Sequence, residues 1–215
     1  MNRFYQWPAS MKWSMALLLL MVGFVPALFI IVRGSEQPLF YFAFFLYLPV
    51  GQFAMTPLFT LLGLYRYYSP LLLGYLPNEK VIDLHSGGSF DYLFVMRGVA
   101  PGAAFRKQVL KYQLEGLLRL IQYVEEKQIP ESVSIVGTSY FFNEKTLQKF
   151  GFKLVEASAF YRLNLLVNFI DITWMYSLAQ GKLSFPKLWK AKKAHISGAA
   201  LVRQRAAIAA VYERL

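Results

Sequence analysis

The residues of this sequence that could do chemistry gather between positions 83 and 91. Asp83 and His85 alternate along a predicted strand, so their side chains point to the same face of it. Histidine takes up and releases a proton near neutral pH, and a neighbouring carboxylate fixes its tautomer, so this pair can serve as a general base. Asp91 could approach from the next predicted strand as an alternative base, and a nearby serine could act as a nucleophile. The alternative interpretation is structural: these polar side chains cap a tight turn, and His85 bonds to the backbone.

A metal site is not expected. The chain contains no cysteine, which excludes disulfides, thiolate catalysis and cysteine-based zinc sites. Its two histidines, His85 and His195, lie far apart in the sequence. No H-x-x-x-H or H-E-x-x-H spacing occurs that would place two ligands on one helix face.

The elements that must position these residues lie in residues 78–160. Two predicted strands, 80–85 and 90–97, form a hairpin around the segment Ser-Gly-Gly-Ser. Apolar residues at helical spacing predict a long helix over residues 105–127. A buried strand, a short helix capped by Asn143 and a last strand complete the order β-β-α-β-α-β. This order predicts a small α/β or α+β layer domain.

The run Ile129-Pro-Glu-Ser-Val-Ser-Ile-Val-Gly-Thr-Ser is followed by Asn143-Glu-Lys-Thr-Leu-Gln-Lys-Phe-Gly-Phe-Lys-Leu. Together with the preceding helix, these runs resemble the C-terminal half of GNAT-type acetyltransferase domains. That family has a long helix, a strand, an asparagine that begins a short helix, and a lysine-x-Gly-Phe turn into the last strand. The resemblance covers about residues 90–156 and implies a GNAT-like fold.

The same resemblance implies acyl-CoA or acetyl-CoA as cofactor. In the family, the loop before the long helix binds the pyrophosphate through backbone N–H groups at the helix N-terminus. The matching loop here contains Gly102 and Ala104. Ser139 follows a predicted buried strand, where ligands often bind in α/β domains, and we assign it with Asn143 to the same site. The alternative is that residues 137–143 are a plain loop leading into the helix that Asn143 caps.

Two runs without charged residues predict a membrane anchor. Hydrophobic residues make up 56% of the chain and charged residues 16%, against about 45–50% and about 25% in a typical soluble domain. Residues 13–32 cover roughly the 30 Å hydrocarbon core as a helix, and a second span is expected over about residues 38–63. A turn-like link joins them, so residues 1–77 form a transmembrane helical hairpin. Its last part, from Tyr65 to Pro77, is either an interfacial segment or the frayed end of the second span.

The charge distribution predicts the orientation of this hairpin. Arg3 and Lys12 precede the first span, and nearly all other basic residues follow the second, so both termini and the α/β domain are expected to be cytoplasmic. A cleaved signal peptide is disfavoured, because its apolar core is about 7–15 residues long and no small-x-small cleavage site follows the first run.

Residues 161–215 are expected to form an amphipathic helix and a basic helical tail. Asn164, Asn168 and Asp171 make one polar stripe on the first helix. A third span would place Asp171 near its centre at a cost of roughly 2.5–3.5 kcal/mol, so we expect this helix to lie on the membrane or against the hairpin. The net charge is +11, and the basic tail favours anionic membrane lipid over nucleic acid as its partner. A protein partner or a second copy of the chain is a further expectation.

Two functions are predicted from these features. The first is a membrane-anchored, acyl-CoA-dependent acyltransferase whose acceptor is an amphiphile or lipid at the cytoplasmic face, with His85 or Asp91 as the base. The second is a noncatalytic integral-membrane scaffold or complex subunit, whose acetyltransferase-like domain has lost its site. An open groove between the predicted strands that end at Met96 and Thr138, with the Gly102 amides pointing into it, favours the enzyme. Phe141 and Phe142 filling that groove favours the scaffold.

Overall fold

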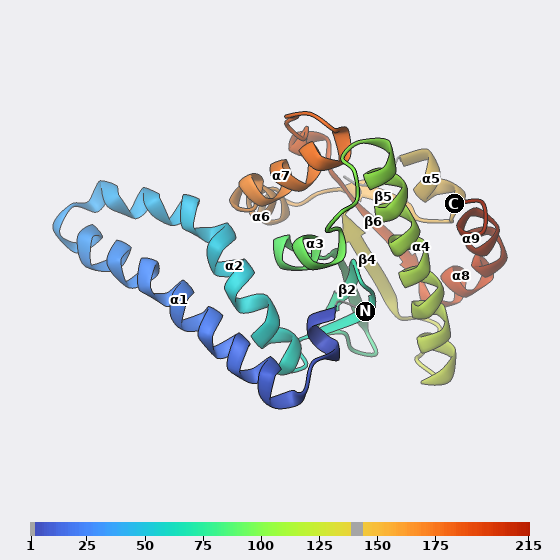
Figure 1. The fold of residues 1–215 in the computed structure, drawn as a ribbon. Helices are drawn as coiled ribbons and strands as arrows, with labels where there is room; N and C mark the ends of the chain where they lie inside the picture. Colours follow the sequence, from blue (N-terminus) through green and yellow to red (C-terminus); the bar gives the residue numbers. More distant parts are fainter. Residues whose placement is uncertain (1–2, 139–143) are drawn as a thin grey trace.

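The computed structural model describes residues 3–138 and 144–215. It is a mixed α+β fold with an N-terminal pair of apolar helices beside a sheet-containing domain (Figure 1). Helix α1 covers Ala9–Glu36 and helix α2 covers Ala43–Leu61, joined by a 3-10 turn at Pro38–Phe42. Within the described part of the chain, two segments are long and apolar enough to cross a membrane, Ala9–Glu36 and Pro38–Leu61. We call residues 9–61 the apolar hairpin.

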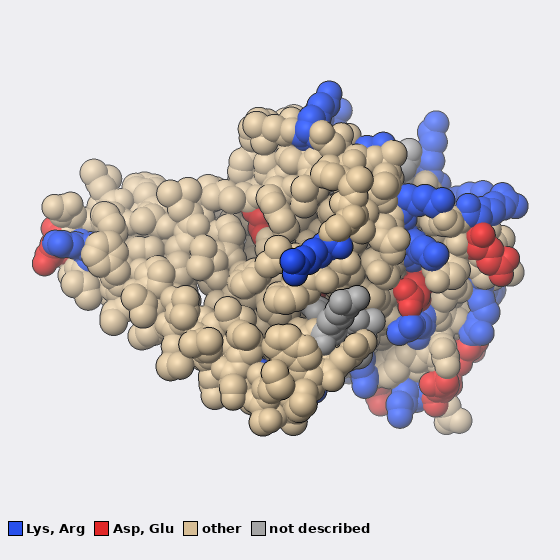
Figure 2. Space-filling model, in the orientation of Figure 1, with Lys and Arg blue, Asp and Glu red and all other residues tan. Residues whose placement is uncertain are grey.

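The two helices of the apolar hairpin approach each other at small residues. A Cβ atom added to Gly23 would lie 2.8 Å from the Cβ of Ala54, and the Tyr47 hydroxyl donates to the Gly23 carbonyl at 2.8 Å. Small residues at such crossings are typical of helices packed in lipid. Figure 2 shows that the visible surface of the hairpin carries charge only at its far tip, where Arg33 pairs with Glu36 at 3.1 Å. On this face, most charged side chains gather on the end of the domain farthest from the hairpin (Figure 2).

The domain is built on a single sheet. Its strands in the described residues are β1 Tyr65–Ser69, β2 Leu72–Tyr75, β3 Val81–Ser86, β4 Ser134–Thr138, β5 Lys153–Glu156 and β6 Lys192–Ser197. Their order in the sheet is β1-β2-β3-β4-β6-β5. Strands β3 and β4 are parallel, and the other neighbouring pairs are antiparallel. The last strand in sequence therefore lies between β4 and β5.

Helices cover the sheet and connect it to the hairpin. Their described bounds are α3 Ser89–Val95, α4 Ala103–Glu126, α5 Glu144–Lys149, α6 Ala159–Val167, α7 Phe169–Gln180, α8 Gly198–Arg203 and α9 Arg205–Tyr212, with short 3-10 turns at Arg3–Gln6 and Leu188–Lys190. Helices α4, α8 and α9 pack together on one side of the sheet, whereas α3 and α7 contact α2 (Figure 1).

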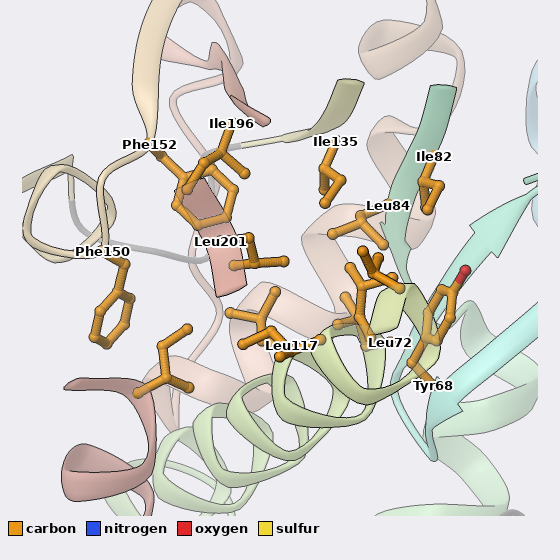
Figure 3. Packing of buried hydrophobic residues seen from close by; sticks show 14 of the residues in the cluster. Tyr68, Leu72, Ile82, Leu84, Leu117, Ile135, Phe150, Phe152, Ile196 and Leu201 are labelled. Atoms are coloured by element: carbon orange, nitrogen blue, oxygen red, sulfur yellow. The ribbon is translucent and has the colours of Figure 1, made fainter. Parts of the chain in front are cut away.

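The main core lies between α4 and the sheet. Leu117 of α4 faces Leu72 and Leu84 of the sheet, and Leu201 of α8 completes this layer (Figure 3). Leu114, Leu120 and Ile121 on the same helix are fully buried, which accounts for the helical spacing of apolar residues in this segment. The N-terminal turn is also packed in, because Phe4 is fully buried against the ring of Phe90, 5.3 Å away.

Several predicted elements are confirmed. The long helix is α4, the buried strand is β4, and the last strand of the predicted series is β5. The short helix is α5, but its predicted cap Asn143 lies outside the described residues.

Other predictions were wrong in secondary structure. Residues 90–97 are not the second strand of a hairpin, because residues 90–95 belong to helix α3. A short, almost uniformly apolar run does not distinguish strand from helix. Residues 161–178 form two helices that break at Asn168, not a single one. The basic tail is not helical throughout, because residues 192–197 form β6 and pair with both β4 and β5.

The region of Tyr65 to Pro77 contains strands β1 and β2 instead of an interfacial segment. Tyrosine and leucine fit a half-buried strand as well as they fit the headgroup layer, so their composition was ambiguous. The sheet therefore includes strands from Tyr65 to Ser197. It extends beyond both predicted boundaries of the α/β domain, at residue 78 and at residue 160.

Candidate functional site

A cavity of about 390 Å³ lies where the apolar hairpin meets the sheet. Its wall includes Gln52, Thr56 and Phe59 of α2, and its opposite side is formed by β1 to β4 together with α6 and α7. His85 and Asp91, the two predicted bases, both line it. The sequence therefore located both residues in one cavity, although it assigned Asp91 to a strand.

The cavity opens where β3 and β4 diverge. Their pairing ends at Leu84 opposite Gly137, yet β3 stays paired with β2 as far as Ser86, and β4 stays paired with β6 as far as Thr138. At their carboxyl ends the two parallel strands therefore no longer pair with each other: β3 pairs only with β2, and β4 pairs only with β6. Ligands in open α/β sheets bind at the carboxyl ends of strands, so this is the expected place for a site.

His85 stands at this opening with its ring stacked on Tyr75, the ring centres 3.8 Å apart. Its Nε2 atom lies 3.2 Å from Oδ2 of Asp83, which confirms that the two side chains share a face of the strand. This contact is not a hydrogen bond, and Nε2 has no hydrogen-bond partner in the described structure. The contact is therefore electrostatic, and it favours the proton on Nε2, which leaves Nδ1 as the proton acceptor.

Asp91 is fully buried on α3, where its Oδ2 accepts a hydrogen bond of 2.8 Å from the Tyr67 hydroxyl. Burial, and then the nearby charge of Asp91, hold the pKa of Tyr67 well above its ordinary value. Tyr67 therefore remains a neutral hydroxyl that can donate at physiological pH. Asp91 is hydrogen-bonded to Tyr67, whereas Nε2 of His85 has no hydrogen-bond partner in the described structure. His85 is therefore the better candidate for a base.

The polar stripe predicted on residues 161–178 also faces the cavity. Asn164, Asn168 and Asp171 all line it. Asp171 accepts a hydrogen bond from the Ser89 hydroxyl, and burial raises the pKa of Asp171 while the bonds from Ser89 oppose this rise. Asn168 accepts from the side-chain amide of Gln52, which ties the junction of α6 and α7 to the hairpin.

The serines of the predicted cluster are not placed as nucleophiles. The Ser86 hydroxyl lies 3.2 Å from the Tyr92 hydroxyl and 3.3 Å from the Gln113 amide. The Ser89 hydroxyl is bonded to Asp171. Neither hydroxyl is hydrogen-bonded to His85 in the described structure, so a serine–histidine pair does not form.

The predicted phosphate-binding loop has a different use. The Gly102 amide donates to the carbonyl of Leu178 at 2.8 Å, and a Cβ added to Gly181 would lie 3.2 Å from the Gly102 Cα. Gly102 has a φ of +93°, which only glycine adopts without strain. It therefore packs α4 against the end of α7, and neither it nor Ala104 lines the cavity. The Gly102 amide is therefore already bonded within the protein, and the assignment of this loop to CoA stays a prediction.

The remaining predicted cofactor residues, Ser139 and Asn143, lie outside the described residues, as do Phe141 and Phe142. Residues on both sides of that gap, Gly137 and Leu147, line the cavity. In residues 3–138 and 144–215, no group of three or more histidine, aspartate or glutamate side chains could hold a metal ion.

Sequence reasoning missed the contribution of the hairpin. Gln52 and Thr56 line the cavity, although both fall in a run that the sequence assigned to lipid. The signal was present in Gln52, because a polar amide within a membrane span usually marks a functional or packed position. Tyr67 was also missed as a partner of Asp91, because residues 65–77 were not recognised as strands.

Comparison with family models, with curated proteins and with solved structures finds no match to this chain. The resemblance to GNAT-type domains therefore remains a prediction, and the function must be inferred from the geometry of the cavity.

Proposed function

We propose that the protein is a membrane-anchored acyltransferase that modifies an amphiphilic or lipid acceptor. The observation that carries this proposal is the shared cavity, in which the apolar hairpin forms one wall and His85 lies on the other. An acceptor that diffuses laterally in the bilayer could keep its hydrocarbon chain along α2 and place its polar end beside His85.

In this reaction His85 takes the proton that the acceptor hydroxyl or amine loses when it attacks the acyl group. Asp83 holds the imidazole in the tautomer that can accept this proton. The acyl group is supplied by a thioester such as acyl-CoA. This donor class rests on the family resemblance, and we assign no described residue to its phosphates.

The proposal places the domain and both termini at the cytoplasmic face, because the basic residues lie on that side of the two spans. Since the chain has no cysteine, single cysteines can report the orientation. In intact cells, a membrane-impermeant maleimide should label Ser35→Cys, at the turn between the helices, but not Glu213→Cys. Permeabilised cells should label both. Labelling of Glu213→Cys alone in intact cells would show the opposite orientation.

The proposed activity is tested with the full chain in lipid nanodiscs. Acetyl-CoA or palmitoyl-CoA is added together with lipid extract, and the release of free CoA thiol is followed over time. We expect release that depends on both protein and acceptor, and an acylated lipid in the mass spectrum. Absence of both thiol release and acyl-CoA binding by calorimetry, in a folded sample, would rule out the acyltransferase.

One observation favours the second candidate, a noncatalytic scaffold. The amide of Gly102, which the resemblance assigns to the cofactor, is already bonded to Leu178. A folded protein that binds no acyl-CoA but co-purifies with a stoichiometric protein partner would support this scaffold role.

A further inference from the structure

The cavity has a charge opposite to that of the protein. The chain carries 23 lysines and arginines and a net charge of +11, yet none of the described residues that line the cavity is a lysine or an arginine. The chain has only three aspartates, and two of them, Asp91 and Asp171, line this cavity. A site for a phosphate or carboxylate headgroup would need positive charge or several free N–H donors, so this lining selects against anions.

The two carboxylates come from different helices, and both line the cavity. Asp171 of α7 accepts a hydrogen bond from Ser89 at the first position of α3. Asp91 lies two residues further along the same helix and accepts from Tyr67. Both are buried, with Asp91 fully buried and Asp171 7% exposed. A carboxylate can accept about four hydrogen bonds, so these two can also serve the donors of a ligand.

Aromatic rings form the wall next to these carboxylates. Tyr65 stacks on Tyr75 with ring centres 4.6 Å apart, and Tyr75 stacks on His85. Phe59 of α2 meets the ring of Tyr65 edge-on, with ring centres 5.5 Å apart, and so continues the wall into the apolar hairpin. These rings are stacked on one another, so they offer a ligand an apolar wall beside the carboxylates, which suits the hydrocarbon part of an alkylammonium group.

We propose that the polar end of the ligand is a cationic amine carried on a hydrocarbon chain. Asp91 and Asp171 supply the counter-charge, the aromatic residues supply an apolar wall, and α2 supplies the apolar path for the chain. This inference rests on the proposed function, since it names the acceptor of that reaction as a long-chain primary amine.

The chemistry of the step is then defined. The bound ammonium first loses one proton to become a free amine. Its nitrogen forms a C–N bond to the acyl carbon as the C–S bond of the thioester breaks, and His85 passes the second proton to the departing thiolate. The products are an amide, a free thiol and one proton released to water.

The test uses calorimetry of the full chain in nanodiscs, with empty nanodiscs as the baseline for partitioning into lipid. The probes share a twelve-carbon chain and differ in their heads: dodecylamine, dodecyltrimethylammonium, dodecanol and dodecyl phosphate. Ethanolamine tests whether the amine alone suffices without the chain. We expect saturable binding of the two cations only. Equal or tighter binding of dodecyl phosphate or dodecanol, or binding of ethanolamine as tight as that of dodecylamine, would overturn the inference.

Variants identify the carboxylates that bind the amine. Asp171→Asn and Asp91→Asn should each weaken the binding of dodecylamine about tenfold or more, because each removes a close opposite charge. Glu156→Gln, on β5 and outside the cavity lining, is the matched control and should bind as tightly as the unmodified protein. Unchanged affinity in both aspartate variants would contradict the assignment.

Folding of the Asp171→Asn variant can be checked in the same samples. Burial raises the pKa of Asp171, so this residue favours the folded state at acidic pH, and that contribution is lost as the pH rises through its folded pKa. At neutral pH the uncharged asparagine should therefore melt no lower than aspartate. If Asp171→Asn does melt lower, its loss of binding is not informative. The amine site is then tested by the binding of the four twelve-carbon probes to the unmodified protein.

Failure of this inference differs from failure of the proposed function. If dodecylamine binds but is never acylated, the amine site stands and the acyltransferase fails. If lipid is acylated but the cationic probes do not bind, the enzyme stands and its acceptor is not an amine. Dodecyltrimethylammonium has no N–H to lose, so it should inhibit acylation of dodecylamine without being consumed.

Discussion

Replacing His85 with glutamine is expected to lower the rate of acyl transfer by about 10²–10⁴-fold, the usual contribution of a general base. Glutamine keeps a polar side chain of similar length but cannot take up the proton of the acceptor. His85 lies in the cavity and its neighbour Asp83 sets its tautomer, so the loss should fall on kcat while the binding of acceptor remains. The measurement is the initial rate of thiol release at saturating acceptor.

The other histidine provides the control. His195 lies on β6 of the same sheet, opposite Val136 of β4, and does not line the cavity. His195→Gln should therefore retain the rate of the unmodified protein. A purely structural role would lower the melting temperature of His85→Gln, whereas loss of the base should lower kcat and leave KM and the melting temperature unchanged. If His85→Gln and His195→Gln transfer the acyl group at the same rate, His85 is not the general base.

Replacing Gly116 with valine is expected to destabilise the domain by about 3 kcal/mol. Gly116 lies on α4 where this helix crosses β2, and an added Cβ would lie 2.6 Å from Cδ2 and 2.7 Å from Cβ of Leu72. Because the Cβ of Leu72 is fixed to the backbone, the helix and the sheet must move apart. At about 2–4 °C per kcal/mol for a chain of this size, the melting temperature should fall by about 6–12 °C.

A valine at an exposed position of α4 is the control, because it places the same residue type in the helix without disturbing the packing of the helix on the sheet. Gln122 is exposed on α4 and bonds only to Glu126 among the hydrogen bonds of the described chain. Gln122→Val should change stability by no more than about 0.5 kcal/mol, as exposed substitutions usually do. Both variants are compared by thermal melting in detergent. A Gly116→Val protein that melts with the unmodified one would show that α4 does not approach the sheet this closely.

The parts of the fold that the sequence predicted well have strong local periodicity. Helix α4 has apolar residues at helical spacing, and most of these residues are buried. The two apolar helices are marked by uninterrupted hydrophobic runs of sufficient length. In both cases the local pattern and the tertiary contacts agree, so the sequence pattern alone was informative.

The parts that were wrong depend on distant partners. Lys192 to Ser197 is basic and unremarkable on its own, and it becomes a strand only because β4 and β5 offer hydrogen-bonding edges on both sides of it. Residues 90–95 are apolar enough for a strand, but they form α3 and pack Phe90 against the N-terminal turn. These contacts join segments that are far apart in the chain, so the local sequence does not reveal them.

The candidate site was predicted in part for the same reason. Asp83 and His85 are two positions apart in one strand, so their shared face followed from local geometry. The joining of His85 with Asp171 and Gln52 in one cavity depends on how α7 and the hairpin meet the sheet. Gly102 packs closely against Gly181 and does not line the cavity, and a glycine that permits tight packing has the same appearance in sequence as one that admits a phosphate.

The position of β6 has a consequence for how the protein is made. Ribosomes deliver the hairpin first, then β1 to β4, then β5, whereas the strand that joins β4 to β5 emerges only after α6 and α7. Until then, one edge of β4 is unpaired, and exposed strand edges promote aggregation. In the proposed membrane-anchored form, a nascent chain held in the bilayer by its hairpin would be kept apart from other such chains during this interval. Membrane attachment would thus protect the sheet during synthesis, before it has any role in delivering an acceptor.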